Sequence, residues 1–567
     1  MKKIIFLVAF LATTITSMAQ FSNGSFLLTE GQYGSSSGGL FWLDPETGSL
    51  GSSVSQEVNG AGYGETAQFA TIYGDKLYVT SKQAGSYGGG LLTVADAATA
   101  KNIYIFSSLS DDGHNYDGRA FCGVTESKGY MGTSNGIFVI DLENNQVVKL
   151  IEGSDCGYGI GEAIDGGYYQ YDVYYHQIGS MVRVGDCVFA SKQNEGILVI
   201  DIATDEIIYT ISAEEFGGSF GELIQSKDGM LWTTACSTEN YIYEHTPELN
   251  KLVMIDPHTC EAIEIPTEHK VSVSWATWRH GMMQACEHSN KILWKDVCYF
   301  DWMMYEQVGA PQILYYDIET GEEGVFVDLT TINPDYSIYA GFSIDPETDN
   351  VYVPVASNSG YGPWFLLVFD PQGTLIGDPI SIPIGDWSDY PSMTLFTDDY
   401  TPEFTLDDKY ILDVNDKIEF NLADIVFDKD NTQNGIIVEI LNVENPEIAT
   451  AEIADNKLTL WMKGQGLTTI TLKALSNGKS TTKNITLSES GTTGIESVGM
   501  FNSQLFYRNG SLNVINSAGS YVTIYNTSGN QLYKHQINSN NFPMPLNLSP
   551  GIYIATVNGN TLKIAIQ

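Results

Sequence analysis

Positively charged residues are scarce in this sequence. Lys and Arg together number 27 among 567 residues, against 69 Asp and Glu, and the net charge is −42. A surface that binds nucleic acid needs a stripe of Lys and Arg, and no such stripe is visible. The charge pattern therefore argues against a nucleic-acid partner, and it agrees with a protein that works outside the cell.

Long apolar runs are missing after the N-terminus, and so is the periodicity of helices. A membrane-spanning helix needs about 18–20 predominantly apolar residues, so no transmembrane segment is predicted in the mature chain. The chain instead contains 33 Tyr, 24 Phe and 56 Gly. This mixture is typical of mostly-β proteins that are rich in turns.

The N-terminus has the pattern of an export signal. Lys2 and Lys3 precede the apolar stretch Ile4–Leu11, and Ser17–Ala19 offers small residues at the cleavage position. This pattern predicts a secretory signal peptide over residues 1–19, too short to span a membrane. No cysteine follows it directly, so lipid attachment at the mature N-terminus is not expected.

Cysteine is present in an odd number, which leaves at least one free thiol in an exported chain. We expect the cysteines to serve mainly as small buried apolar residues, and no disulfide is assigned. The seven are Cys122, Cys156, Cys187, Cys236, Cys260, Cys286 and Cys298.

One short phrase occurs seven times between residues 40 and 370: an apolar strand that runs into an aspartate and a polar turn. The spacing of the aspartates lies between 45 and 61 residues. A period of roughly 40–50 residues with several strands per repeat is typical of a β-propeller. The aspartate is expected to close a hairpin, because Asp side chains bond the backbone of their own turn. The seven are Asp44, Asp96, Asp141, Asp201, Asp256, Asp317 and Asp370.

The best-formed repeats expand to four antiparallel strands, which is one propeller blade. The first repeat lacks its innermost strand, since it begins at Phe26–Gly31 with nothing strand-like before it. Ser392–Asp399, far downstream, is an innermost strand without a blade of its own. Pairing these two segments closes the ring and covers sheet edges that would otherwise be exposed.

The fold class predicted is therefore all-β: a seven-bladed β-propeller followed by two small β-sandwich (Ig-like) domains. Short alternating strands after the propeller favour the first sandwich. Asp428–Asn431 is expected to be a solvated turn in preference to a cation site, and no metal or cofactor is assigned. The predicted domains are residues 1–19 (signal peptide), 20–400 (propeller), 401–488 (Ig-like sandwich) and 489–567 (C-terminal domain).

The loops after the second and fourth strands of each repeat are long and rich in aromatic residues, whereas the opposite turns are short. These loops gather on one face of a propeller, and exposed Tyr and Trp offer contact area together with polar handles. That face is the predicted ligand site. Its candidate ligand-binding residues are Tyr63, Lys82, Gln83, His114, Tyr116, Arg119, His176, Lys192, Gln193, Glu222, Trp275, Trp278, Arg279, His280, Trp302, Tyr336, Trp364 and Trp387. Tyr33 and Tyr87 belong to the same loops.

Signals for catalysis are weaker. The sequence has no GxSxG elbow, no HExxH helix and no phosphate-cradling glycine loop. A polysaccharide lyase could use His114, Tyr116 and Arg119, or Arg279 and His280, as acid and base. A glycosidase could pair two of several carboxylates, namely Glu65, Asp117, Glu162, Glu222 and Asp301. A third alternative is an adhesion or scaffold module.

The C-terminal segment resembles the sorting domain of the type IX secretion system. The matching residues are Val522–Asn526 with Gly529, Leu548, Pro550–Tyr553 and Lys563. The resemblance covers about 75 residues. It implies a Bacteroidetes-type bacterium, the type IX machinery as a partner, and a secreted or cell-surface location.

The repeat region resembles Bacteroidetes surface propellers of unknown function, a group similar to the corrinoid-binding propeller BtuG. The resemblance rests on the aspartate phrases and on the inter-blade pieces Ala61–Gly64 and Cys156–Gly159. It implies capture of a corrinoid or similar ligand beside an outer-membrane transporter. The leading hypothesis is a non-catalytic binding protein for a nutrient, a corrinoid or a glycan.

Overall fold

The computed structural model divides the chain into two compact units, Met1–Ser490 and Gly491–Gln567. No helix among the described residues is long and apolar enough to cross a membrane. The predicted signal peptide lies outside the described residues. These are 21–84, 87–111, 116–156, 163–164, 168–169, 176–237, 251–269, 271, 280–296, 299–301, 306–357, 362–385, 389–489, 504–508, 511–515, 517–539, 541–557 and 560–566.

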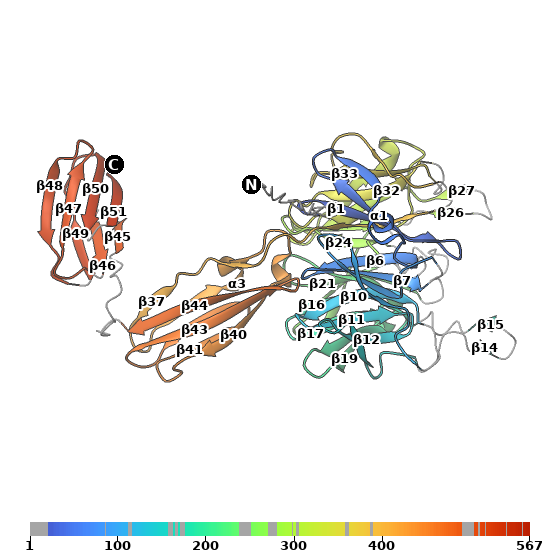
Figure 1. Ribbon diagram of the computed structural model, residues 1–567, viewed down its shortest axis with the longest axis horizontal. Helices are drawn as coiled ribbons and strands as arrows, with labels where there is room; N and C mark the ends of the chain where they lie inside the picture. The colour runs from blue at the N-terminus through green and yellow to red at the C-terminus, as the bar shows by residue number, and fades with distance from the viewer. Residues whose placement is uncertain are drawn as a thin grey trace, which may run out of the picture. The chain divides into compact units, whose positions relative to one another are not determined.

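Antiparallel sheets dominate the first unit (Figure 1). The described part of residues 25–396 holds six four-stranded sheets and one five-stranded sheet, besides three two-stranded hairpins. In order from the innermost strand, the first three sheets are β35 (Pro391–Phe396), β1 (Ser25–Thr29), β4 (Leu40–Asp44) and β5 (Ser49–Ser53); β6 (Glu65–Tyr73), β7 (Lys76–Gln83), β8 (Leu92–Asp96) and β9 (Asn102–Phe106); and β10 (Gly118–Thr125), β11 (Lys128–Thr133), β12 (Gly136–Asp141) and β13 (Gln146–Leu150).

The remaining sheets continue the same order. The fourth to seventh sheets are β16 (Ile178–Val184), β17 (Cys187–Lys192), β18 (Gly196–Asp201) and β19 (Glu206–Ser212); β20 (Gly218–Gln225), β21 (Leu231–Ser237), β22 (Lys251–Ile255) and β23 (Ala262–Ile265); β24 (Met283–Ala285), β25 (Lys291–Lys295), β28 (Gln312–Asp317) and β29 (Glu323–Asp328); and β30 (Ser337–Ile338) with β31 (Ser343–Ile344), β32 (Val351–Ala356), β33 (Trp364–Phe369) and β34 (Ile380–Ser381). The hairpins are β2 (Gly31–Gln32) with β3 (Ser36–Ser37), β14 (Ala163–Ile164) with β15 (Tyr168–Tyr169), and β26 (Tyr299–Asp301) with β27 (Glu306–Val308), and α1 spans Val54–Asn59.

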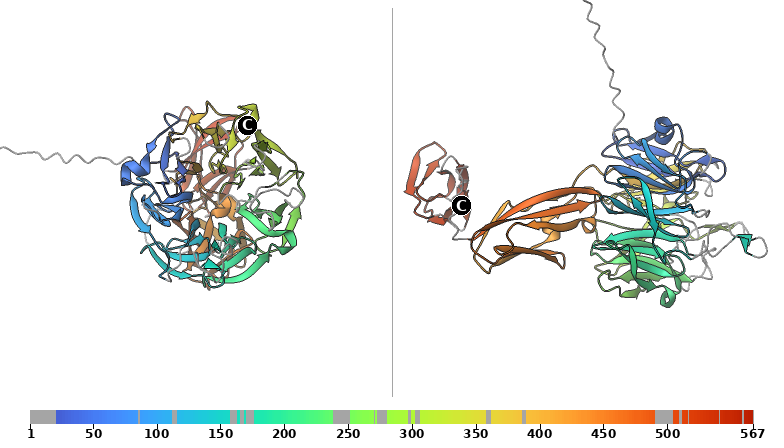
Figure 2. Two further views of the ribbon diagram at one scale, coloured as in Figure 1. Left: turned by 90° about the vertical axis from the view of Figure 1, so that its right-hand side faces the viewer. Right: turned by 60° about the horizontal axis from the view of Figure 1, so that its bottom comes forward.

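The innermost strands form a closed ring. Each contacts the innermost strand of the next sheet, in the order β35, β6, β10, β16, β20, β24, β31 and back to β35. Figure 2 (left) shows the sheets following one another around a centre in chain order. Apolar clusters fill the wedges between neighbouring sheets. This arrangement is a β-propeller.

The ring is closed by two strands that lie far apart in the sequence. β1 pairs antiparallel with β35, with Leu27 opposite Thr394. The predicted pairing of the first repeat with the downstream segment is thus confirmed. Asp389 ties the two chain segments together, since it accepts a hydrogen bond from the Thr29 hydroxyl at 2.7 Å and from the Gly31 N–H at 2.6 Å.

The buried carboxyl group of Asp389 at this closure is expected to make the ring more stable at pH 5 than at pH 7. Burial raises the pKa of Asp389 to about 6, above the unfolded value near 3.9. The folded chain then binds the extra proton between about pH 4 and 6, so this stability is present below pH 4 and is lost as pH rises through 6. The contribution of one such group is on the order of 2–3 kcal/mol.

Scanning calorimetry at pH 5 and pH 7 tests this expectation. The Asp389→Asn variant should lose part of the wild-type gain in melting temperature at pH 5. Asp378→Asn, at an exposed position, is the matched control and should keep the whole gain. Equal pH responses in wild type and Asp389→Asn would refute the assignment.

The seven repeated aspartates close the hairpins between the third and fourth strands, as predicted. Each side chain accepts a hydrogen bond from at least one backbone N–H two to four residues later. The residue four positions after the aspartate has a positive φ in the first six turns, for example 52° at Asn145 and 56° at Asp205. Left-handed backbone favours Gly, Asn and Asp, which occupy four of these six positions, whereas Ala100 and Cys260 occupy the other two.

Residues 403–489 form two sheets that share one core. One sheet is β37 (Lys409–Leu412), β44 (Lys479–Glu489), β43 (Leu467–Ser476) and β40 (Ile437–Val443), and the other is β38 (Lys417–Asn421), β42 (Lys457–Met462) and β41 (Ala449–Ala454), joined by α3 (Leu422–Ile425). Leu458, Leu460, Leu472 and Ile485 are all fully buried in their common core. A small pair, β36 (Glu403–Phe404) and β39 (Val426–Phe427), lies beside them. We refer to residues 403–489 as the sandwich.

The sandwich contacts the short-turn side of the ring. Asn477 donates to the Ile72 carbonyl at 2.9 Å, and Asn434 donates to the Ser226 carbonyl at 2.8 Å. Lys429 pairs with Glu347 at 2.7 Å. Asp428 and Asp430 are buried, so the expectation of a solvated turn at Asp428–Asn431 was wrong. These residues belong to the contact between the sandwich and the ring.

The second unit is also all-β. Its strands are β45 (Gln504–Arg508), β46 (Ser511–Ile515) and β49 (Asn541–Pro545) in one sheet, and β48 (Gln531–Gln536), β47 (Tyr521–Asn526), β50 (Gly551–Val557) and β51 (Asn560–Ile566) in the other. Val522 and Ile524, both in the segment that resembles the sorting domain, are fully buried in its core.

Candidate functional site at the mouth of the ring

One end of the ring gathers the starts of the innermost strands and the ends of the second strands. Antiparallel pairing places Glu65 opposite Gln83 and Ile178 opposite Lys192. Polar residues that flank these strand ends therefore come from several sheets to one place. We call this end, defined by residues 82–83, 117–119, 176–177 and 192–195, the mouth.

A chain of polar contacts crosses the mouth from sheet to sheet. The Arg119 guanidinium lies 3.1 Å from an Asp117 carboxylate oxygen and donates to the Gln177 side-chain oxygen at 2.8 Å. Gln177 then donates to the Gln193 side-chain oxygen at 2.9 Å. Lys82 lies 4.0 Å from Asp117. The structure thus brings the predicted residues Lys82, Arg119 and Gln193 together.

Burial shapes the charges at the mouth. It lowers the pKa of Lys82, with the charge of Arg119 adding to the effect and the carboxylates of Asp117 and Glu30 opposing it. Burial also raises the pKa of Asp117, while Arg119 and Lys82 counteract. A partly desolvated ammonium, guanidinium and carboxylate are thus held side by side, where hydrogen bonds to charged groups are strong.

A second group of predicted residues lies beside the first. Lys192 is paired with Glu195 at 2.7 Å, and its ammonium also donates to the carbonyls of Gly153 and Asp155. His176 lies 3.8 Å from the same Glu195 carboxylate. Lys192 is almost fully buried, so its charge is already used to fix the loops around it. Its role is to shape the mouth.

His280 and Glu222 lie below the mouth. The His280 Nε2 is 2.9 Å from the Arg119 carbonyl oxygen, and its Nδ1 is 3.6 Å from the Glu222 carboxylate. The imidazole also packs on the Phe69 ring at 4.7 Å between centroids. Glu222 accepts backbone N–H groups from Gly281, Met282 and Met283. His280, just before β24, therefore links that strand to β10, and we call this contact the His280 crossbar. Glu222 of β20 binds the backbone at the start of β24 and so joins these two sheets.

The predicted aromatic residues that the structure describes are not at the mouth. Tyr63, Tyr116, Tyr336 and Trp364 are all buried, with exposed fractions of 7% or less. Each packs in an apolar cluster between or within sheets. The expectation that these four rings contact a ligand was wrong, because the wedges between sheets need large apolar side chains and the loop rings fill them.

Other predicted residues are placed differently. Gln83 is half-buried at the end of β7. His114, Trp275, Trp278, Arg279, Trp302 and Trp387 lie outside the described residues. Of the loop tyrosines, Tyr33 and Tyr87 are 71% and 46% exposed. The Tyr87 hydroxyl lies 3.4 Å from the Gly34 carbonyl oxygen, so these two exposed rings are on neighbouring loops.

Sequence reasoning missed Glu30, Gln68 and Gln177, and it indicated Asp117 only as a carboxylate that a glycosidase could pair. Gln68 and Tyr339 both donate to the Glu30 carboxylate at 3.2 Å. Gln177 and Asp117 each stand one residue before an innermost strand, next to predicted residues. That position was the only available signal, since neither residue has a distinctive spacing.

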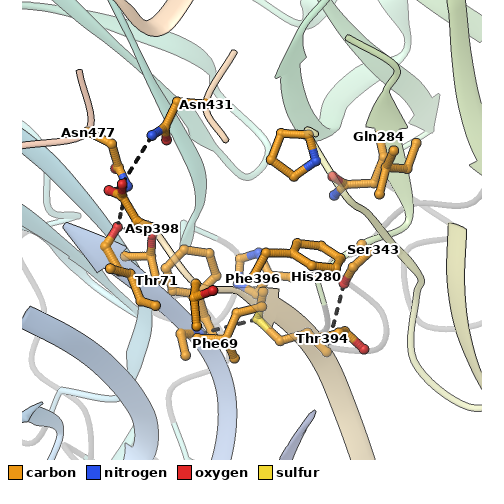
Figure 3. Close-up of a pocket in the computed structure, with 18 of the residues that line it drawn as sticks. Phe69, Thr71, His280, Gln284, Ser343, Thr394, Phe396, Asp398, Asn431 and Asn477 are labelled. Atoms are coloured by element: carbon orange, nitrogen blue, oxygen red, sulfur yellow. Dashed lines mark hydrogen bonds between the residues drawn. The ribbon is translucent and has the colours of Figure 1, made fainter. Parts of the chain in front are cut away.

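A cavity of about 290 Å³ lies on the other side of His280. Its walls come from β6, β20, β24, β31 and β35, and from Asp430, Asn431 and Asn477 of the sandwich. Figure 3 shows Asp398, Asn431 and Asn477 together on one side of it, with His280 and Phe69 on another. We call it the chamber.

The closed ring of sheets defines this protein as a β-propeller. The polar side chains gathered at one end of the ring form its candidate binding site. The chain belongs to the family described as a domain of unknown function, DUF5074, whose model matches residues 23–397. The predicted propeller family is thus confirmed, whereas the likeness to BtuG stays a prediction. No curated protein matches the chain.

The chain is also similar, at low identity, to several solved structures. A quinonprotein alcohol dehydrogenase-like protein of Bacteroides thetaiotaomicron is 14% identical over 66% of this chain and 79% of its own, with a TM-score of 0.46. PorZ, a type-IX secretion surface component of Porphyromonas gingivalis, is 12% identical over 93% of this chain and 62% of its own, with a TM-score of 0.37. The periplasmic gluconolactonase PpgL of Pseudomonas aeruginosa is 14% identical over 65% of this chain and 98% of its own, with a TM-score of 0.38.

Proposed function

We propose that this protein is a secreted or cell-surface binding protein whose propeller captures a nutrient ligand at the mouth. In this proposal each of the seven sheets is one blade of a seven-bladed ring. The ring occupies residues 20–400, after a signal peptide at 1–19. An Ig-like sandwich follows at 401–488, and residues 489–567 form a type IX sorting domain.

The observation that carries the proposal is the polar chain Lys82–Asp117–Arg119–Gln177–Gln193. Four separate strand ends contribute to it, and burying such groups is costly unless they are satisfied. A fold that only needed stability would place apolar residues there. Convergent polar groups at one end of a ring are instead typical of a ligand site.

Binding is better supported than catalysis. A general acid or base must reach a substrate atom, yet the Glu222 carboxylate accepts three backbone N–H groups and Asp117 is held by Arg119. Neither is placed as half of a carboxylate pair. The described groups act as hydrogen-bond partners, and Tyr33 and Tyr87 add ring surface.

We propose a corrinoid or a glycan as the ligand, since both carry many hydrogen-bonding groups on an extended surface. An outer-membrane transporter would receive a corrinoid, and the type IX machinery would export the chain. A thermal-shift screen of the purified full chain against cobamides and a panel of glycans tests the proposal. At least one compound should raise the melting temperature in a concentration-dependent way. A screen without any shift would contradict it.

A further inference from the structure

The chamber has the size of a site for a small molecule. Ligand pockets typically enclose about 300–1,000 Å³, and the chamber holds about 290 Å³. This volume corresponds to about ten water molecules at roughly 30 Å³ each, or to one small organic molecule. It is too small for a corrinoid or an oligosaccharide, so its occupant differs from the ligand proposed for the mouth.

Carboxylates outnumber cationic groups among the residues that line the chamber. Three carboxylates line it, those of Glu222, Asp398 and Asp430, and neither Lys nor Arg is among its lining residues. Lys479 pairs with Asp398 at 3.2 Å from outside this lining. Burial raises the pKa of Asp398, and it raises that of Asp430 to about 6. A cation inside the chamber would stabilise the ionised forms of Asp398 and Asp430.

The apolar part of the wall restricts the kind of cation. The rings of Phe69, Phe342 and Phe396 line the chamber together with Met393. No group of three His, Cys, Asp or Glu side chains suited to a metal ion occurs in the described part of the chain. Aromatic rings beside carboxylates are instead the surroundings in which proteins bind organic ammonium groups.

A buried hydroxyl group in the wall lacks a partner. Thr394 lines the chamber and is 2% exposed, but its Oγ1 makes no hydrogen bond within the described residues. A buried unsatisfied hydroxyl costs about 1–3 kcal/mol. A ligand group that hydrogen-bonds to this oxygen would relieve the cost.

We propose that the chamber is a second binding site, which takes a small alkylammonium compound. Its charged nitrogen lies beside Asp398 and Asp430, and its carbon groups lie against Phe69, Phe342 and Phe396. The site lies on the sandwich side of the His280 crossbar and does not depend on what the mouth binds.

Calorimetric titration of the full chain with choline at pH 8 tests the proposal. One choline per chain should bind, and 3,3-dimethyl-1-butanol, a neutral compound of the same shape, should bind at least tenfold more weakly. Binding should weaken at pH 5, where Asp430, faced by Asp398 and Asp428 and with Glu222, His280 and Lys479 nearby, holds a proton. Equal binding of the two compounds, or no binding of choline, would overturn the proposal.

Variants separate the chamber from the mouth. Asp430→Asn keeps an oxygen that can accept the Asp399 N–H but removes the charge, and it should weaken choline binding at least tenfold. Asp335→Asn, at an exposed position, is the matched control and should leave binding unchanged. Lys82→Met should also leave it unchanged. If Lys82→Met abolishes choline binding while Asp430→Asn does not, choline binds at the mouth and the proposal is wrong.

Discussion

Replacing Arg119 by Leu should lower the free energy of unfolding by about 3–5 kcal/mol, because removing one member of a buried ion pair strands the other. Arg119 is 4% exposed and Asp117 is 5% exposed, and their charged atoms lie 3.1 Å apart. Lys82, at 4.0 Å, is too far away to take over the hydrogen bond. Thermal or urea unfolding of the first unit measures the loss.

The double variant Arg119→Leu, Asp117→Leu is the control for this prediction. Replacing both partners by apolar groups of similar size is often nearly neutral, so the double variant should recover at least half of the lost stability. If Arg119→Leu alone lowered the free energy of unfolding by less than about 1 kcal/mol, the Arg119–Asp117 pair would behave as an exposed pair. That result would contradict the burial of this pair at the mouth.

Replacing Phe26 by Ala should have a comparable effect on the closure of the ring, at about 3–5 kcal/mol. Phe26 is fully buried on β1. Its ring packs on Phe21 at 5.1 Å and on Trp42 at 4.9 Å between centroids. It belongs to the cluster that also holds Leu395 of β35 and Leu77 of the next sheet, so one side chain joins the closing sheet to its neighbour.

Ile208→Ala serves as the matched apolar control. Ile208 lies on the outer strand β19 and is 57% exposed, so its truncation should change stability by less than about 0.5 kcal/mol. Differential scanning calorimetry of both variants gives the comparison. Similar small losses for Phe26→Ala and Ile208→Ala would mean that the ring does not depend on β1 for its closure.

The ring was largely predictable from sequence because its signal is repeated. Each aspartate such as Asp141 or Asp201 follows an apolar strand and precedes a turn, and the structure confirms that each side chain bonds its own turn. The missing inner strand before Phe26 and the surplus strand after Ser392 indicated the closure. The contact between the sandwich and the ring was not predictable, because Asn434 and Asn477 sit in ordinary polar turns and bind backbone carbonyls.

The candidate site was predictable only in part. Position relative to strand ends placed Lys82, Arg119 and Gln193 at one end of the ring, where the structure also has them. It failed for rings such as Tyr63 and Trp364, because a loop aromatic can turn inward to the wedge as readily as outward, and one sequence does not show which. The His280 crossbar depends on a contact 161 positions away, with Arg119, which no local pattern reveals.

Calorimetric titration of the full chain with cyanocobalamin and with a panel of defined glycans tests the central claim most directly, in wild type and in two lysine variants. Lys82→Met changes the mouth, whereas Lys227→Met changes an exposed lysine that donates to the His288 carbonyl at the opposite end of the ring. At least one compound should bind wild type, with Lys82→Met at least tenfold weaker, about 1.4 kcal/mol, and Lys227→Met unchanged. Absence of binding throughout, or equal weakening in both variants, would contradict a ligand site at the mouth.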